Sequence, residues 1–339
     1  MENSKKNIIV LGDSCEDLFF KVERMPLLGE TLDTHGSYKS YGGKGANSAL
    51  AIGKLGYDIE FLTQVGSDLQ GRELIEELKE MKVGTQYIKT LDKVNTGLGF
   101  ILQLKTGDNV VISVGGANTA YDPNMTTLYP DWVTAIQNAN MICLQRLIPD
   151  YVNLVAAKIA KEAGVTVILD VGGMSSNVLP ELYQYLDYIS PNETEIERML
   201  GRKYDNNNLE EELHQFLKKY SHLKLLLKQG ETGATLMYLK DQQVDGEVIK
   251  IFSPAYKFAD FEHLNLHLTD TAGAGDCFTG AFAAKLSEFH KDDKLNEIET
   301  YTKCLQFGNR VGFLCVSKAG TMSSVPSIEE VERVFGKDI

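Results

Sequence analysis

Short continuous apolar runs alternate with amphipathic stretches along most of this chain. The runs are typical of strands buried on both faces, and they lie at Asn7–Gly12, Ile59–Val65, Met141–Leu144, Val165–Val171 and Leu223–Lys228. The stretches between them repeat apolar residues with a helical period, at Gly45–Leu55, Gly71–Met81, Asp150–Ala163, Thr194–Leu200 and Leu209–Tyr220. This alternation predicts an α/β fold, with a doubly wound, mostly parallel sheet and helices on both faces. Right-handed crossovers then place bound ligands at the carboxyl edge of the strands.

Two further segments interrupt the alternation and indicate strand pairs. The first pairs Leu18–Val22 with Thr31–Lys39, and the second pairs Gly97–Leu104 with Asn109–Val114 through a Lys-Thr-Gly-Asp turn typical of hairpins. We expect these strands to form a small antiparallel β lid, inserted at about 15–42 and 95–117 into one domain that spans residues 1–339. A surface hairpin without function is the alternative. The long connection Lys240–His267 either adds strands to the sheet or forms a loop.

Composition and charge narrow the class of protein. The 339 residues suffice for one large α/β core with additions or for two domains. A net charge of −13 argues against nucleic acid or an anionic membrane as partners, since both are polyanions. No apolar run approaches the roughly 18 residues of a membrane span. The cysteines are far apart and lack metal-binding spacing, which favours reduced thiols and a cytoplasmic location; they are Cys15, Cys143, Cys277, Cys304 and Cys315.

A Gly-Ala-Gly turn between an apolar segment and a helical pattern, within Leu268–Phe282, carries candidate chemistry. Gly273 and Gly275 let a ligand approach the backbone, and the first N–H groups of the helix lack internal partners. The amides of Gly273, Ala274 and Gly275 therefore form a candidate anion site. Asp276 follows directly and can accept a hydroxyl proton while those amides hold the charge of a phosphoryl group. The alternative is a helix N-cap with a glycine-rich entry.

A second glycine-rich turn lies near the start of the chain, at Tyr41–Gly56. Its Gly43, Lys44, Gly45 and Asn47 belong to a Gly-Gly-Lys-Gly-Ala-Asn motif, whose polar side chains are placed to reach a ligand's hydroxyls. Neither the Walker spacing nor the dinucleotide fingerprint is present. With both turns in this order, the chain resembles the ribokinase-like (PfkB) family of sugar and nucleoside kinases from about Ile8 to Pro326. The first turn is most similar to that of the ribokinases in the family.

This resemblance implies the fold of the family and ATP-dependent phosphorylation of a sugar, with D-ribose and its 5-hydroxyl as the expected acceptor. Asp276 is then the general base, and the amides of the Gly-Ala-Gly turn stabilise the transferring charge. The lid covers the sugar and carries the contact of a homodimer. A kinase of another sugar or of a nucleoside is one alternative, and a non-catalytic sugar or nucleotide sensor is another.

The remaining site residues are also implied by the resemblance. Those expected to bind the sugar are Asp17, Gly43, Lys44, Gly45 and Asn47. Those expected to bind ATP are Asn192, Lys228, Gly230, Gly233, Gly275 and Asn309. Mg²⁺ is expected near Asn192 and Glu195, and K⁺ near Asp270, Ala272, Cys315, Lys318, Gly320 and Ser324. On local grounds alone, an acid-rich helix start explains Asn192 and Glu195, and a plain hairpin turn explains Lys228–Gly233.

Two positions depart from the ribokinase pattern. Where the ribokinases have Asn-x-Asp after the first strand, this chain has Cys15-Glu16-Asp17. Where they have a sugar-contacting Glu before Ser-Pro, Leu147 aligns, although a shift of one residue near Arg146 would change that alignment. The catalytic set is therefore intact, whereas the set that holds the acceptor is altered.

Overall fold

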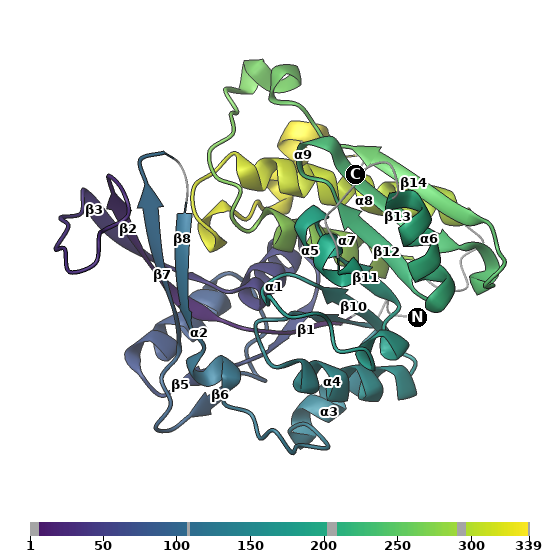
Figure 1. Cartoon of the computed structure of the whole chain (residues 1–339), viewed down its shortest axis with the longest axis horizontal. Helices are drawn as coiled ribbons and strands as arrows, with labels where there is room; N and C mark the ends of the chain where they lie inside the picture. Colours follow the sequence, from purple (N-terminus) through teal and green to yellow (C-terminus); the bar gives the residue numbers. More distant parts are fainter. Residues whose placement is uncertain (1–6, 107–108, 202–208, 290–295, 338–339) are drawn as a thin grey trace.

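An 8-stranded sheet forms the centre of the structure, a computed structural model that describes residues 7–106, 109–201, 209–289 and 296–337 (Figure 1). Across it the strands follow the order β14 (Val248–Pro254), β13 (Gly233–Leu239), β12 (Lys224–Lys228), β11 (Tyr188–Ser190), β10 (Thr166–Asp170), β9 (Met141–Leu144), β1 (Ile8–Leu11) and β4 (Ile59–Leu62). The pairs from β12 to β4 are parallel, whereas β12–β13 and β13–β14 are antiparallel. The prediction of a mostly parallel sheet is confirmed.

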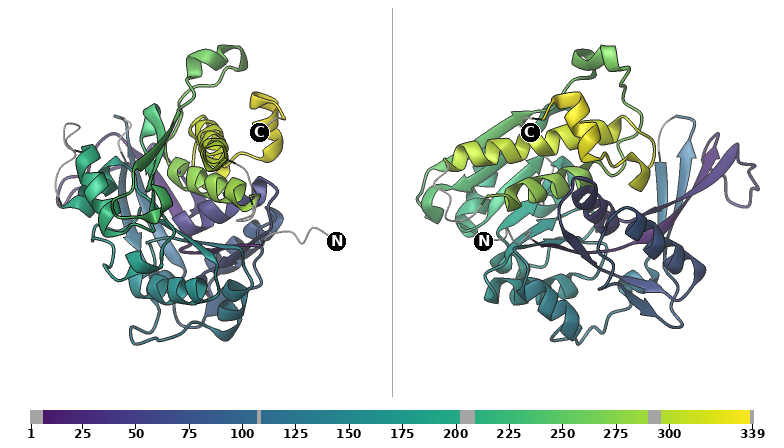
Figure 2. Two further views of the ribbon diagram at one scale, coloured as in Figure 1. Left: turned by 90° about the vertical axis from the view of Figure 1, so that its right-hand side faces the viewer. Right: turned by 180° about the vertical axis from the view of Figure 1, so that it is seen from behind.

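Helices cover both faces of this sheet (Figure 2). They are α1 (Lys44–Lys54), α2 (Leu69–Glu80), α3 (Pro130–Gln137), α4 (Asp150–Glu162), α5 (Glu193–Leu200), α6 (Leu209–Lys219), α7 (Ala274–Ser287), α8 (Glu297–Val316) and α9 (Ile328–Phe335). Apolar side chains of α1, α2, α7, α8 and α9 belong to one core, and those of α3, α4, α5 and α6 to the other. In β1, Ile8 and Val10 enter the first core while Ile9 and Leu11 enter the second, because successive side chains of a strand point to opposite faces.

Short 3₁₀ helices complete the connections: η1 (Gly116–Thr119), η2 (Leu182–Tyr185), η3 (Gly230–Thr232), η4 (Lys240–Gln242), η5 (Phe258–Leu264) and η6 (Met322–Ser324). The predicted strand Ile59–Val65 divides into β4 and β5 (Gln64–Gly66), and β5 leaves the main sheet to pair with β6 (Lys89–Leu91). The connection Lys240–His267 contributes β14 and η5, so it adds a strand to the main sheet.

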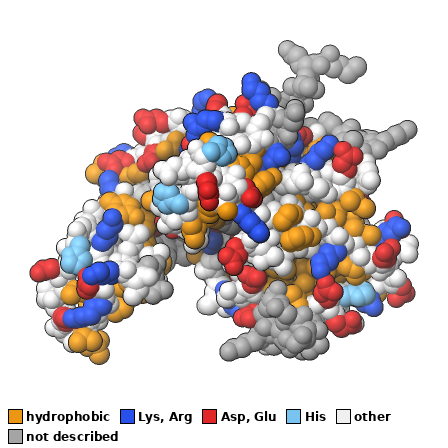
Figure 3. Space-filling view, turned by 90° about the horizontal axis from the view of Figure 1, so that it is seen from above, with side chains coloured by type: hydrophobic (Ala, Val, Ile, Leu, Met, Phe, Trp, Pro, Cys, Tyr) orange, Lys and Arg blue, Asp and Glu red, His pale blue; other side chains and the backbone are white. Residues whose placement is uncertain are grey.

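The second sheet is the lid, with the strand order β3 (Gly36–Gly42), β2 (Cys15–Val22), β7 (Gly97–Leu104) and β8 (Asn109–Val114). Each predicted hairpin is antiparallel, but β2 and β7 pair in parallel, so the two hairpins join into a mixed sheet. Gly107 and Asp108 of the predicted turn lie outside the described residues. Seen from above, the lid stands out from the body as an arm that carries charged side chains (Figure 3).

Among the described residues, none of the helices combines the length and apolar character that a membrane crossing requires.

Candidate active site

Asp276 lies in the first turn of α7, directly after the Gly-Ala-Gly turn. Gly273 is the N-cap and has a φ of 76°, a left-handed conformation that glycine adopts without a steric penalty. The Ala274 amide donates to the carbonyl of Thr271 at 3.3 Å, so it is engaged locally. Within the described part of the chain, the amides of Gly273 and Gly275 have no such partner. Two of the three predicted anion-binding amides are therefore available to a ligand.

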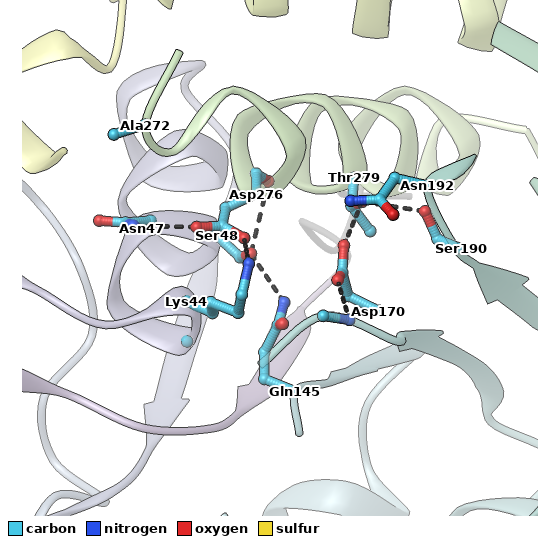
Figure 4. Close-up of polar contacts among 12 residues, drawn as sticks. Lys44, Asn47, Ser48, Gln145, Asp170, Ser190, Asn192, Ala272, Asp276 and Thr279 are labelled. Carbon is cyan, nitrogen blue, oxygen red and sulfur yellow. Dashed lines mark hydrogen bonds and ion pairs between the residues drawn. The ribbon is translucent and has the colours of Figure 1, made fainter. Parts of the chain in front are cut away.

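The carboxylate of Asp276 is buried and is held at both oxygens by residues of α1 (Figure 4). Lys44 Nζ lies 3.2 Å from Oδ1, and Asn47 Nδ2 donates to Oδ2 at 2.9 Å. The Asp276 carboxylate raises the pKa of Lys44, so the ammonium stays charged. The two glycine-rich turns, distant in sequence, therefore meet through these contacts.

Ser48 and Gln145 form a hydrogen-bonded chain that ends at the backbone of Asp276. Gln145 Nε2 donates to Ser48 Oγ at 2.8 Å, and Ser48 Oγ donates to the backbone carbonyl of Asp276 at 3.4 Å. Both side chains are completely buried. They link β9, α1 and α7 at the point where the general base is expected to act.

The turn that carries Lys44 is fixed by Asp13, a residue that sequence analysis missed. Asp13 Oδ1 accepts from the Gly45 amide at 3.0 Å, and its backbone carbonyl accepts from Ala46 at 3.1 Å. Gly43 has a φ of 100°, and a Cβ there would lie 2.8 Å from Asp13 Oδ2. Burial raises the pKa of Asp13 to about 6. The position of Asp13 directly after the first predicted strand could have identified it as a candidate site residue.

Asp17 belongs to the lid strand β2, where two glycines make room for its carboxylate. A Cβ on Gly42 or Gly99 would lie 2.2 or 2.1 Å from a carboxylate oxygen. Cys15 Sγ donates to Asp17 Oδ1 at 3.4 Å, and burial raises the pKa of Asp17 to about 6.

Asn47 Oδ1, in α1, is buried and has no partner among the described residues, so it remains free to accept from a ligand.

A cavity of about 1080 Å³ runs from Lys44 and Asp276 across the amino-terminal end of α7. Its wall includes the residues predicted to bind ATP, and of the other residues predicted near a metal it includes Glu195 alone: Asn192, Lys228, Gly230, Gly233, Gly275, Asn309 and Glu195. Tyr256, Phe258 and Phe313 add aromatic surface at the wall. The structure therefore brings Lys44, the Gly-Ala-Gly turn and the predicted ATP-binding residues to one cavity.

Asn192 and Glu195 form a reciprocal cap at the start of α5. The Asn192 side chain accepts from the Glu195 amide, and Glu195 Oε2 accepts from the Asn192 amide, each at 2.8 Å. The local alternative of a helix start is therefore realised. Glu195 Oε1 is not used in this cap, and it lies 2.9 Å from the point that a Cβ on Gly172 would occupy, as does Lys44 Nζ. The described residues contain no cluster of three or more metal-binding side chains.

Asp170 is a second residue that sequence analysis missed. It lies at the end of β10, completely buried, and its Oδ2 accepts from Lys228 Nζ at 2.5 Å and from Thr279 Oγ1 at 2.8 Å. Asp170 and Thr279 appear together in Figure 4. The acidic end of an otherwise apolar run, Val165–Val171, was the signal for this residue.

The loop after β12 and Asn309 form the far wall of the cavity. The loop joins two antiparallel strands, β12 and β13, so it has the geometry of the hairpin alternative while also lining the cavity. Asn309 Nδ2 donates to Ser253 O at 3.0 Å and to Pro254 O at 3.1 Å. Asn309 therefore ties α8 to β14, and its amide group is already occupied.

The residues predicted to hold a monovalent cation converge beside α7, with one exception. Asp270 accepts from the amides of Ala272 and Gly320 at 3.0 and 3.1 Å. Cys315 Sγ lies 3.8 Å from Ala272 O and 3.2 Å from Ser324 Oγ. The Lys318 side chain instead pairs with Glu330 at 2.7 Å and points away from this group.

Arg146 and Leu147 are neighbours in sequence, but their side chains have different surroundings in the structure. Arg146 is buried and pairs with Asp150 at 2.7 Å, so it is committed to the body of the protein. Leu147 lies against Gly173, where an added Cβ would come within 2.7 Å of Leu147 Cγ. An apolar side chain therefore lies beside Gly173, and its alignment with the ribokinase glutamate stays a prediction.

Comparison with known proteins decides the family. The pattern of the pfkB family carbohydrate kinases matches residues 5–328. The chain belongs to this family. The ribokinase of Arabidopsis thaliana is 32% identical over 333 residues, which cover 97% of this chain and 80% of that protein. The ribokinase of Staphylococcus aureus is also 32% identical, over 96% of this chain and 99% of that protein.

Solved structures of the pfkB family agree with this assignment. The structure of the Arabidopsis thaliana ribokinase complexed with ribose and ATP superposes with a TM-score of 0.83, at 32% identity, over 97% of this chain and 98% of that chain. This chain therefore shares the overall fold of that ribokinase.

Proposed function

We propose that the protein is an ATP-dependent kinase that transfers the γ-phosphoryl group of ATP to the 5-hydroxyl of D-ribose. The observation that carries this proposal is the buried Asp276 carboxylate, held by Lys44 and Asn47 at the end of the cavity where free amides of Gly273 and Gly275 lie. The ribokinase relatives, one of them solved with ribose and ATP, support the choice of substrates.

Asp276 accepts the proton of the sugar hydroxyl as that oxygen attacks phosphorus. Lys44 and Asn47 fix both carboxylate oxygens, so the base is oriented before the sugar arrives. The amides of Gly273 and Gly275 donate to the transferring phosphoryl oxygens. Phosphoryl transfer needs little covalent help from the protein, and positioning with charge stabilisation supplies most of the acceleration.

On the sugar side, Asp17 of the lid and the free Oδ1 of Asn47 accept from sugar hydroxyls. Gly43 and Gly45 let the turn pack against Asp13, and we propose that the sugar binds along this turn. Asn192, Lys228, Gly230, Gly233 and Asn309 form the wall for ATP.

The residues at the site offer oxygen ligands to Mg²⁺ and to K⁺. Mg²⁺ keeps several waters and needs few direct carboxylates, and Glu195 Oε1 offers one oxygen at the cavity. For K⁺, Ala272 O and Ser324 Oγ both lie against Cys315 Sγ, whereas the Lys318 side chain pairs with Glu330. Mg²⁺ would neutralise phosphate charge, and K⁺ would order the anion site. Equal rates in K⁺, Na⁺ and a bulky organic cation at one ionic strength would refute the K⁺ site.

We place the protein in the cytoplasm as a homodimer formed through the lid, with no nucleic acid or membrane partner. The edge strand β8 exposes Val111 and Ile112, whose exposed fractions are 62% and 59%, and such edges invite pairing. Sedimentation of the wild type and an Ile112→Lys variant tests the contact, because only the wild type should be dimeric. A wild-type monomer would refute it.

A coupled ADP-release screen tests the function. The protein is assayed with ribose, other pentoses, hexoses and nucleosides, and with ATP alone. We expect ADP release that depends on sugar and is fastest with ribose. A preference for a nucleoside or hexose would favour the other kinases of this fold. Nucleotide or sugar binding without turnover would favour the sensor.

A further inference from the structure

Asp170 and Lys228 form a buried ion pair, and Lys228 is the member that lines the cavity. Asp170 ends β10 and Lys228 ends β12, with β11 between them in the sheet. The side chains are 1% and 12% exposed, and their charged atoms are 2.5 Å apart. A buried pair of this kind costs desolvation energy and is not in itself a sign of stability.

Both oxygens of the Asp170 carboxylate accept hydrogen bonds, whereas the Lys228 ammonium donates only one among the described residues. Besides Lys228, Asp170 accepts from the Gly172 amide at 3.0 Å and from Thr279 Oγ1 at 2.8 Å. Thr279 Oγ1 also lies 3.1 Å from Ser190 Oγ, so the carboxylate is fixed by β10, α7 and β11. Lys228 has three donors, and within the described residues only Asp170 accepts from its ammonium.

The unused side of the Lys228 ammonium faces the anion site. A Cβ placed on Gly275 would lie 3.7 Å from Lys228 Nζ, and both residues line the cavity. Gly275 carries one of the free amides. A phosphoryl group bound by that amide therefore lies within reach of the Lys228 ammonium.

Charge explains why the pair stays ionised before a ligand binds. Burial alone would raise the pKa of Asp170, but Lys228 and Lys44 lower it below its usual value. Asp170 thus remains an anion that aims and partly neutralises Lys228. An arriving polyphosphate adds negative charge next to a cation that has donors to spare.

We propose that Lys228 is a catalytic residue that donates a hydrogen bond to the transferring phosphoryl group, and that Asp170 is the positioning residue that aims it. The inference rests on the proposed ATP-dependent transfer. The bond between phosphorus and the ADP oxygen breaks, the bond to the sugar oxygen forms, and the sugar proton passes to Asp276. Lys228 keeps its protons and stabilises the negative charge on the equatorial oxygens of the transferring phosphoryl group.

The competing interpretation is that Lys228 only neutralises buried Asp170, and a double-variant cycle separates the two. Lys228→Met alone leaves an uncompensated buried carboxylate, so we expect its melting temperature to fall by roughly 5–10 °C. Lys228→Met combined with Asp170→Asn removes both charges and should recover most of that loss. Lys250→Met, on the exposed edge strand β14, is the matched control.

Turnover should not recover with stability. We expect kcat of the double variant to stay about 10²-fold below wild type, the cost of losing one donor to a developing anion. Lys228→Arg keeps a cationic donor and should regain at least about tenfold of that loss. A double variant with wild-type kcat would overturn the inference.

Binding measured by calorimetry, without sugar, gives a readout independent of catalysis. In the double variant we expect AMP affinity to change less than about twofold, while affinity for a non-hydrolysable ATP analogue with Mg²⁺ falls about tenfold, as expected for one charged hydrogen bond. Equal losses for both ligands would overturn the inference alone. A wild-type protein that binds no adenine nucleotide would overturn the proposed function as well.

Discussion

At the scale of single residues, the sequence motifs predicted which residues form the centre of the site. They did not predict the buried residues that hold those residues in place. Asp276, Lys44 and Asn47 were predicted from two glycine-rich turns, and the structure brings them together. Asp13 and Asp170 were missed because their importance depends on burial and on partners distant in sequence. A strand-end carboxylate resembles a solvated one until the sheet order is known.

Asp276→Asn keeps the shape of the side chain and removes the base. We expect kcat to fall by roughly 10²–10⁴-fold with little change in ATP affinity, measured by steady-state kinetics and calorimetry. Asp245→Asn, at an exposed loop position, serves as the control. Near wild-type turnover in the Asp276 variant would remove Asp276 from the mechanism.

Leu147→Glu tests whether an apolar residue at this position weakens the binding of the sugar acceptor. A site that hydrogen-bonds a hydroxyl rejects analogues that lack it, whereas an apolar wall discriminates weakly. We expect the wild type to have a high KM for ribose and to accept 2-deoxyribose as a competitor. The Glu variant should bind ribose about 1–2 kcal/mol more tightly, while Leu147→Met should change little. Tight ribose binding and rejection of 2-deoxyribose by the wild type would contradict this prediction.

Asp13→Asn should change how stability depends on pH. The folded-state pKa of Asp13 is about 6, above its usual value of 3.8, so the wild type is relatively more stable below pH 4 and loses that contribution as pH rises through 6. Asn does not ionise and still accepts from the Gly45 amide. Urea unfolding should show the variant gaining roughly 2–3 kcal/mol relative to wild type between pH 4 and 7.5. A difference that is constant with pH would contradict the assignment.

At the scale of elements, the predicted strands and helices were found, while their ends required the structure. The start of α1 is set by Gly43 and Asp13, and the start of α7 by Gly273. The predicted run Ile59–Val65 is one segment in sequence but two strands in space, because β5 pairs with β6 instead of continuing in the main sheet. Apolar pattern alone does not reveal which partner a strand takes.

Gly43→Ala tests whether the first turn needs glycine. The added Cβ meets Asp13 at a φ of 100°, so we expect a loss of roughly 2–4 kcal/mol in the free energy of unfolding together with loss of sugar binding. Gly56, beyond the other end of α1, has a φ of 88° but no heavy atom within 4 Å of an added Cβ. Gly56→Ala should therefore cost only about 1 kcal/mol and keep sugar binding. Equal effects in the two variants would show that backbone strain, not Asp13, explains the loss.

At the scale of the whole molecule, alternation of apolar runs and helices predicted the parallel sheet but not its antiparallel edge. The hairpin alternative for Lys228–Gly233 is consistent with the pairing of β12 and β13, whereas the mixed composition of Lys240–His267 did not decide that β14 joins the sheet. The parallel pairing of β2 with β7 joins two hairpins that are separated by α1 and α2. Such contacts are decided by the packing of the whole chain. The result is a lid that brings Asp17 to the edge where α1 and α7 begin.

The most direct test of the account is identification of the product. The wild-type protein is incubated with ATP, Mg²⁺ and ribose, and phosphorus–proton coupling in the NMR spectrum locates the new phosphate ester. The account predicts ribose 5-phosphate and ADP in equal amounts, with no ADP formed when ribose is left out. ADP formation that does not depend on ribose, or a phosphate on a different hydroxyl, would contradict it.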